Sequence, residues 1–171
     1  MPTDAIRTIM GRRSVRSYHT KPLPEKDLKA IVEAGRHAPS AANRQPWHIV
    51  VVCDEEQKKK LAAACSNQTW LADAGAIIAG VGKPEVSEKW YMVDVAIALE
   101  NMVLAATSLG YGTCWIGAFD QDQVREVLGV PDDLVVVALT PVGFPKDEPN
   151  ARPRMPLAEF ASLDRYGQAY G

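Results

Sequence analysis

The stretch KWYMVDVAIALENMVLAATSL, residues 89–109, decides the fold of this chain. Its apolar residues recur at helical spacing and are Met92, Val95, Ala96, Leu99, Met102, Val103 and Ala106. They cover more of the circumference than the single stripe that a surface helix buries, so helix 89–109 is predicted to be buried on most sides. A chain of 171 residues has limited room for such a helix. Part of it is therefore predicted to pack against another subunit.

Strands and further helices are predicted on both sides of this helix. Short apolar runs predict strands at 48–53, 76–81, 113–116 and 134–142. Thr3 or Asp4 is predicted to cap a helix that runs to Met10. Asp54 is predicted to cap a helix over 55–65, and Asp120 is predicted to cap a helix over 121–129. Helical spacing also predicts a helix over 25–37. Such interleaving indicates one layered domain over residues 1–171.

The segments between these elements are predicted to be irregular. Residues 12–24 lack a clear period, and residues 39–47 are rich in small and turn-forming residues, so both are predicted loops. The proline-rich stretch after residue 142 is predicted to wrap over the surface before a short end segment.

Composition indicates a soluble cytoplasmic protein. A net charge of -2 gives no overall attraction to nucleic acid or to an anionic membrane. Cys53, Cys65 and Cys114 are an odd number, widely spaced and without a CxxC pair, which predicts a reducing compartment and no disulfide. The start of the chain lacks the apolar run of a signal peptide, and no stretch is predicted to span a bilayer.

Signatures of side-chain catalysis are absent from the sequence. It contains no GxSxG, HExxH or GxxxxGK[ST] motif. His19, His37 and His48 show no ligand spacing, so no metal site is predicted. If the protein is an enzyme, a bound cofactor is expected to carry the reaction, with no catalytic side chain.

Two groups of arginines stand out in this slightly acidic chain. The stretch RRSVR, residues 12–16, places Arg12, Arg13 and Arg16 around Ser14, and RPR places Arg152 and Arg154 near the end. Guanidinium groups match phosphate oxygens, and two clusters on loops suit two sides of one phosphate. Two alternatives stay open for these residues, namely solvated surface charge and, for RRSV, a kinase site.

A third motif, PSAANRQPW at residues 39–47, carries the amides Asn43 and Gln45 among small residues. Amides supply both donors and acceptors, as the edge of a heteroaromatic ring requires, and small neighbours allow the backbone to approach a flat ligand. An ordinary loop with Ser40 as a cap is the alternative.

Taken together, RRSVR, PSAANRQPW, DVAIALENMVLAATSLGYGTCWIG (94–117) and RPR resemble the FMN-dependent nitroreductase family over nearly the whole chain, in order and at compatible spacing. The resemblance implies an α+β, three-layer α/β/α fold with a mixed central sheet, helices on both faces and an extended C-terminal tail. It also implies a homodimer with two FMN molecules at the subunit interface, each contacted by both chains.

The resemblance assigns roles to individual residues of this sequence. Arg12, Arg13, Ser14 and Arg16 correspond to the segment that holds the FMN phosphate, ribityl chain and pyrimidine edge, and the phosphate is also met by Arg152 and Arg154. The loop that each chain contributes to the flavin of its partner corresponds to Pro39, Ser40, Ala41 and Asn43, and Gln45 supports this loop. The segment against the isoalloxazine corresponds to Cys114, Trp115, Ile116 and Gly117, and a further polar flavin contact to Asn67. Some relatives carry an acidic residue where this chain has Ile116.

The reaction implied is hydride transfer from NADH or NADPH through flavin N5 to a nitroaromatic, a quinone or a similar flat conjugated acceptor, in ping-pong fashion. Alternatives within the fold are reductive dehalogenation, ring dehydrogenation and flavin fragmentation; a non-enzymatic flavin carrier is another. An RNA-binding role is disfavoured by the net charge. Four aromatic residues are predicted to line the acceptor slot or, equally, to pack in the core or at the dimer contact. They are Trp70, Trp90, Tyr91 and Phe119.

Overall fold

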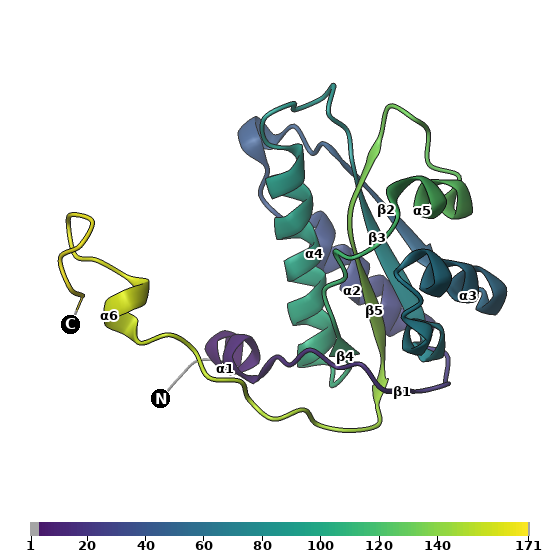
Figure 1. Cartoon of the computed structure of the whole chain (residues 1–171), viewed down its shortest axis with the longest axis horizontal. Helices are drawn as coiled ribbons and strands as arrows, with labels where there is room; N and C mark the ends of the chain where they lie inside the picture. The colour runs from purple at the N-terminus through teal and green to yellow at the C-terminus, as the bar shows by residue number, and fades with distance from the viewer. Residues whose placement is uncertain (1–3, 171) are drawn as a thin grey trace.

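The computed structural model describes residues 4–170 of the chain, and Figure 1 shows the arrangement of its elements. In chain order the elements are α1 (Asp4–Gly11), β1 (Tyr18–His19), α2 (Glu25–Arg36), the 3-10 turn η1 (Ala41–Asn43), β2 (Trp47–Val52), α3 (Glu55–Ala64), the 3-10 turn η2 (Thr69–Asp73), β3 (Ala76–Gly82), α4 (Tyr91–Ser108), β4 (Gly112–Thr113), α5 (Gln121–Leu128), β5 (Val135–Pro145) and α6 (Leu157–Phe160).

The strands form one sheet in the order β1-β5-β3-β2, with β4 paired to β5. The pairs between these named strands are antiparallel. A parallel bridge between Ser14 and Thr113 supplies the mixed character of the sheet. This bridge fastens the arginine-rich segment beside β4, so the sheet positions the region of the predicted site.

Helices cover both faces of the sheet, which confirms the predicted three-layer α+β fold. On one face α2 and α4 pack against alternate residues of β3 and β5, with Leu99 and Met102 fully buried. On the other face α3 and α5 cover the intervening residues, including Ile77 and Leu139. Figure 1 shows α4 running along the sheet with α3 and α5 on the far side.

Gly80 of β3 allows α4 to lie directly on the sheet. A Cβ atom at this position would stand 2.7 Å from Val95 Cγ1 and 2.8 Å from Leu99 Cδ1, which is closer than carbon atoms pack. By length and composition alone α4 could also cross a membrane, so the prediction that no stretch is apolar enough was wrong. In the fold α4 packs against α2 and the sheet.

The predicted boundaries hold for several elements and fail for others. Asp54 and Asp120 accept hydrogen bonds from the N–H groups of Gln57 and Gln123, which confirms both caps. Helix 89–109 is shorter than predicted, because residues 83–90 form turns before α4. The strand over 113–116 was wrong: pairing covers Gly112–Thr113, and Ile116 makes a separate bridge to Leu139. The predicted loops contain β1, η1 and the start of β2. Thr3, one predicted cap, lies outside the described residues.

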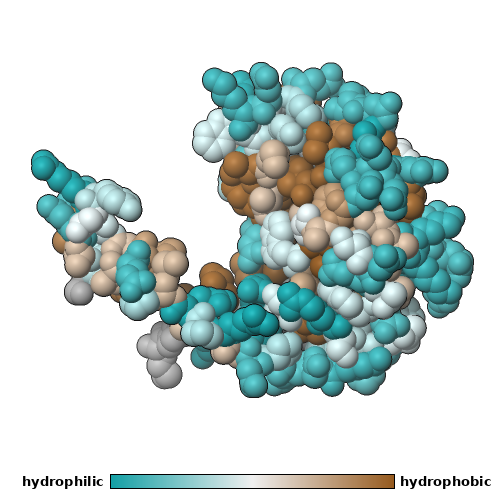
Figure 2. Space-filling model, in the orientation of Figure 1, coloured by the Kyte–Doolittle hydropathy of each residue, from teal (hydrophilic) through white to brown (hydrophobic). Residues whose placement is uncertain are grey.

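The prediction that the proline-rich stretch wraps over the surface was wrong for its last part, α6, which leads away from the body. Residues 151–170 are here called the tail. Figure 1 shows the tail and α6 leading away from the body, and Figure 2 shows a hollow between the two. The tail exposes the large apolar side chains of Met155, Leu157, Phe160, Leu163, Tyr166 and Tyr170. No apolar surface within residues 4–170 covers these side chains.

A hydrogen bond of 2.6 Å from the Tyr111 hydroxyl to Asp27 Oδ2 ties the segment after α4 to α2. Burial and this bond raise the pKa of Tyr111 from 10.0 to about 12. Unfolded chains lose the tyrosine proton near pH 10 while the folded protein keeps it, so this tyrosine makes stability fall between about pH 10 and 12.

We expect Tyr111→Phe to lower the free energy of unfolding at pH 7 by about 1.5 kcal/mol, since Asp27 loses its donor. The variant should also lack the part of the fall in stability between about pH 10 and 12 that Tyr111 causes. Urea unfolding of both proteins at pH 7, 10 and 12 measures both effects. If the stability of the variant falls as steeply at alkaline pH as that of the parent, Tyr111 is not the group responsible.

Candidate functional site

The two arginine clusters, far apart in sequence, lie around one cavity of about 260 Å³, here called the arginine cavity. It is lined by Arg12, Arg13, Ser14, Arg16, Pro149, Asn150, Arg152 and Arg154. One wall comes from the segment after α1, which the bridge to β4 holds in place. The other wall comes from the chain after β5. Pro149 and Asn150 were missed by the sequence analysis, although they lie close to RPR in the sequence.

The lining of the arginine cavity is strongly positive, although Asp147 and Glu148 line a neighbouring cavity beside Arg13. The arginine cavity itself is lined by five arginines and no acidic residue. Within residues 4–170, none of the five forms an ion pair with a carboxylate. Arg13 donates to the carbonyls of Met10 and Arg12, which fixes it at the end of α1. Like charges gathered in this way favour binding of an anion, and guanidinium forks match phosphate or carboxylate oxygens.

The segment Cys114–Gly117 adjoins the arginine-rich segment, residues 12–16. Val15 N–H donates to the Thr113 carbonyl at 2.8 Å, directly before this segment. Ile116 exchanges backbone hydrogen bonds with Leu139, at 2.9 and 3.1 Å, and is buried. The Ile116 N–H is therefore occupied by the protein. A ligand at this segment would have to meet a different backbone donor.

Asn67 lies near the same segment. It stands in the turn after α3 with φ of 55°, and its neighbour Ser66 donates from Oγ to the Ala118 carbonyl at 3.5 Å. The side chain of Asn67 is exposed. The structure thus places Asn67 beside the end of the Cys114–Gly117 segment and outside the lining of the arginine cavity.

Cys114 and Trp115 face different surroundings. Burial raises the pKa of the Cys114 thiol, although Arg16, Ser14 and Arg12 act in the opposite direction. This keeps the thiol protonated near pH 7, where it serves as a small packing group. Trp115 donates from its indole nitrogen to Glu100 Oε2 on α4 at 2.8 Å. Its ring is thereby held against the outer side of α4.

The loop over residues 39–45, here called the amide loop, has a strained backbone. Ala42, Asn43 and Gln45 have φ of 51°, 53° and 51°, in the left-handed region that residues with a Cβ rarely adopt. Each such residue costs on the order of 1 kcal/mol and persists only when its surroundings impose it. Ser40 Oγ accepts from Gln45 N–H at 3.0 Å, and the Gln45 amide donates to Asn43 Oδ1 at 3.3 Å. Such strain is typical of a functional segment.

Asp94 anchors the amide loop to α4. The side chain is only 3% exposed, and its two oxygens accept from Ala41 N–H at 3.2 and 3.3 Å. With Pro39, Ser40 and Trp90 it lines a cavity of about 270 Å³. Sequence reasoning gave this residue no role. The available signal was a carboxylate among the apolar residues of the first turns of α4, because a buried charge needs a partner.

The amide loop and the arginine cavity lie at opposite ends of α4. The loop contacts Asp94 in the first turns of the helix, whereas Arg13 shares a cavity with Thr107 and Gly110 at its end. At 1.5 Å per residue, thirteen residues of helix correspond to about 20 Å. One chain therefore does not bring the two halves of the predicted site together.

The predicted aromatic candidates divide between core and surface. Trp70 stacks on Tyr18 with ring centroids 6.2 Å apart, and Phe119 packs against the α3–α5 core. Tyr91 packs against Gly82, where a Cβ atom would stand 2.3 Å from its ring. Trp90 is 52% exposed and lines the cavity beside the amide loop. Of the four, Trp90 is the exposed one, and the other three are half-buried.

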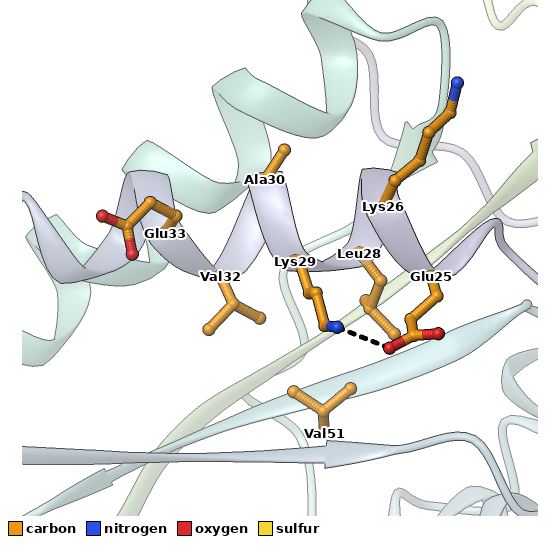
Figure 3. Close-up of a pocket in the computed structure, with 8 residues that line it drawn as sticks. All are labelled: Glu25, Lys26, Leu28, Lys29, Ala30, Val32, Glu33 and Val51. Carbon is orange, nitrogen blue, oxygen red and sulfur yellow. Dashed lines mark ion pairs between the residues drawn. The ribbon is translucent and has the colours of Figure 1, made fainter.

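A larger cavity of about 780 Å³ lies between α2 and the edge strand β2, away from all of these residues. Figure 3 shows Leu28, Val32 and Val51 along its apolar side, with Lys29 paired to Glu25 at one end. None of the predicted site residues lines it. Three of its charged residues are paired, Lys29 with Glu25 and Glu33 with Arg36 outside the lining, and the cavity offers no group of converging donors.

Comparisons with known proteins agree on one family. The sequence signature of the nitroreductase family matches residues 9–82 and 63–144. A protein of Archaeoglobus fulgidus, named as a candidate NADH dehydrogenase/NAD(P)H nitroreductase, is 37% identical over 152 residues, 85% of this chain and 87% of that protein. The structure of NfrA2 from B. megaterium matches with a TM-score of 0.92 at 29% identity, over 97% of this chain and 76% of that one. NADPH:FMN oxidoreductase from Vibrio harveyi, complexed with NAD+, matches with a TM-score of 0.89 at 27% identity, over 98% and 80%.

Proposed function

This chain belongs to the nitroreductase family, and on that premise we propose that it uses FMN to pass hydride from NADH or NADPH to a flat conjugated acceptor, such as a nitroaromatic or a quinone. The two substrates would react in turn at one place, in ping-pong fashion. We further propose that the protein is cytoplasmic, without nucleic-acid or membrane partners, and that residues 1–171 form one domain.

The observation that carries this proposal is the arginine cavity. Five guanidinium groups from two distant segments surround one space without a carboxylate among them. A phosphate monoester, as FMN carries, fits this donor set in charge and in hydrogen-bonding geometry. Arg12, Arg13, Arg16, Arg152 and Arg154 would hold the phosphate, with Ser14 beside them.

The remaining residues would orient the ring system. When bound, FMN supplies the chemistry of accepting and returning a hydride. The Ile116 N–H is bonded to Leu139, so other N–H groups of the segment, those of Trp115 and Gly117 among them, would be the donors for the ring edge. Trp115 is held by Glu100, and Asn67 stands nearby. These residues would bind and position the ring, and no side-chain acid or base is needed from them.

A homodimer completes the site in this proposal. The amide loop lies about 20 Å from the arginine cavity along α4, so Pro39, Ser40, Ala41, Asn43 and Gln45 would act on the flavin of the partner chain. Figure 2 shows hydrophobic side chains exposed over the upper part of α4. The exposed apolar side chains of α1, α4 and the tail need cover in water and support the same conclusion.

We expect purified protein to be yellow, with the absorbance bands of an oxidised flavin and FMN released on denaturation. Added NADH or NADPH should bleach these bands under anaerobic conditions, and a quinone should restore them. Steady-state oxidation of each nucleotide with nitroaromatic and quinone acceptors then distinguishes an enzyme, which turns over, from a flavin carrier, which does not. A colourless protein that also fails to take up added FMN would refute the proposal.

A further inference from the structure

The buried carboxylate of Asp94 is the starting point. Among the described residues, its one hydrogen-bond donor is Ala41 N–H, which approaches both oxygens at 3.2 and 3.3 Å. A buried charge is unfavourable unless it is paired or hydrogen-bonded, and the first turns of a helix favour a negative charge. Asp94 thus lies where α4 tolerates a carboxylate, and this carboxylate is aimed at one backbone atom of the amide loop.

The bonded atom directly precedes the strained part of that loop. Ala42 and Asn43 follow Ala41 with left-handed φ of 51° and 53°. The bonds Asn43 N–H to the Ser40 carbonyl, at 2.9 Å, and Gln45 N–H to Ser40 Oγ, at 3.0 Å, close the loop on itself. They do not fix its position relative to α4. The bond from Ala41 to Asp94 does.

We propose that Asp94 is a positioning residue of the flavin site, because its carboxylate holds the amide loop in the left-handed conformation that presents Asn43 to the flavin of the partner chain. This inference rests on the proposed FMN-dependent homodimer. Asp94 itself touches neither cofactor nor substrate in this scheme. It acts through Ala41 on a side chain that does.

Loss of the carboxylate has a specific consequence in this structure. Asp94 lines the cavity of about 270 Å³ together with Pro39, Ser40 and Ala41, so its removal enlarges an existing space beside the loop. The Ala41 N–H would lose its partner, and the left-handed residues could relax to more favourable angles. Asn43 would then leave its position, although the arginine cavity at the other end of α4 would be unchanged.

The first experiment compares Asp94→Ala and Asp94→Asn with the parent. FMN affinity is measured by quenching of flavin fluorescence, and flavin reduction by stopped flow at saturating FMN. We expect Asp94→Ala to weaken FMN binding about tenfold and to slow reduction, whereas Asp94→Asn keeps an acceptor oxygen and should restore most of both.

A matched control is available at the start of α3. Asp54 also accepts a backbone N–H, from Gln57 at 2.9 Å, but it caps a helix away from the amide loop. Asp54→Ala should lower thermal stability and leave FMN affinity and the reduction rate unchanged. If Asp54→Ala and Asp94→Ala reduce FMN affinity equally, the effect is one of general stability and the proposal fails.

The decisive experiment pairs two defective chains in one dimer. A heterodimer of Asp94→Ala with Arg12→Ala/Arg154→Ala, isolated through two different affinity tags, contains one site with an intact arginine cavity and an intact amide loop. The other site carries both defects. We expect one FMN per dimer at parental affinity, although each mutant homodimer binds weakly.

The outcomes separate this inference from the function on which it rests. Failure of the parent protein to bind FMN would refute the proposed function. Tight binding by the parent with equal binding by Asp94→Ala would overturn the role of Asp94 alone. A heterodimer that binds FMN no better than the two mutant homodimers would likewise overturn the role of Asp94.

Discussion

Arg12→Ala and Arg154→Ala proteins should purify with little flavin. Each arginine is expected to form charge-assisted hydrogen bonds to the FMN phosphate, worth roughly 1.5 to 3 kcal/mol apiece. Loss of one should weaken FMN binding roughly tenfold to over a hundredfold, and the double variant should lose about a hundredfold or more. Fluorescence titration with FMN measures the effect. The rate of flavin reduction should largely return in excess FMN, because neither residue reaches the reacting ring.

Two further variants make this result specific. Arg36→Ala removes an exposed arginine of α2 that pairs with Glu33, and it should leave FMN binding unchanged. Asn43→Ala should show the opposite pattern to the cavity variants, with modest flavin loss but slower reduction even at saturation. Full retention of FMN by both Arg12→Ala and Arg154→Ala would mean that the clusters are only surface charge.

Leu104→Glu should convert the protein to a monomer that does not retain FMN. Val93, Ile97, Glu100 and Leu104 follow one another at spacings of four, three and four residues, so they share one face of α4. All four are exposed or half-buried in the single chain. In a two-fold dimer the new carboxylate is buried twice, at about 2 kcal/mol or more each, which weakens association more than a hundredfold.

Light scattering and sedimentation, with and without saturating FMN, measure this result. Ala30→Glu is the matched control, since it places the same charge on an exposed position of α2. That variant should remain dimeric and yellow. A parent protein that is monomeric in saturating FMN would contradict both the dimer and the shared site, and a dimeric Leu104→Glu would place the interface elsewhere.

Much of this architecture was predictable from local sequence. The caps at Asp54 and Asp120 depend on a side chain and a backbone N–H three residues later, which the sequence shows directly. The fold was likewise predictable, because apolar periodicity and whole-chain resemblance agreed. The approach of Arg12 to Arg154 followed from the idea that two basic loops suit one phosphate.

The remaining features depend on contacts between distant segments. The strand expected at 113–116 is cut short because its pairing is set by β5, and Ile116 meets Leu139 separately. Asn43 is of a type that often adopts left-handed φ, but Ala42 and Gln45 are not, so residue type alone did not predict this loop conformation. Asp94 was visible as a carboxylate in the mostly apolar first turns of α4, but its partner lies fifty-three positions away in the sequence.

The location of the two half-sites at opposite ends of α4 couples cofactor retention to protein concentration. If each FMN needs the arginine cavity of one chain and the amide loop of another, cofactor binding and dimerisation are linked equilibria. If dimerisation raises FMN affinity by a given factor, FMN binding raises the dimerisation constant by the same factor. Dilution alone would then strip flavin from the protein, and a cell that makes little of this chain would hold less of it in the loaded form than its FMN concentration suggests.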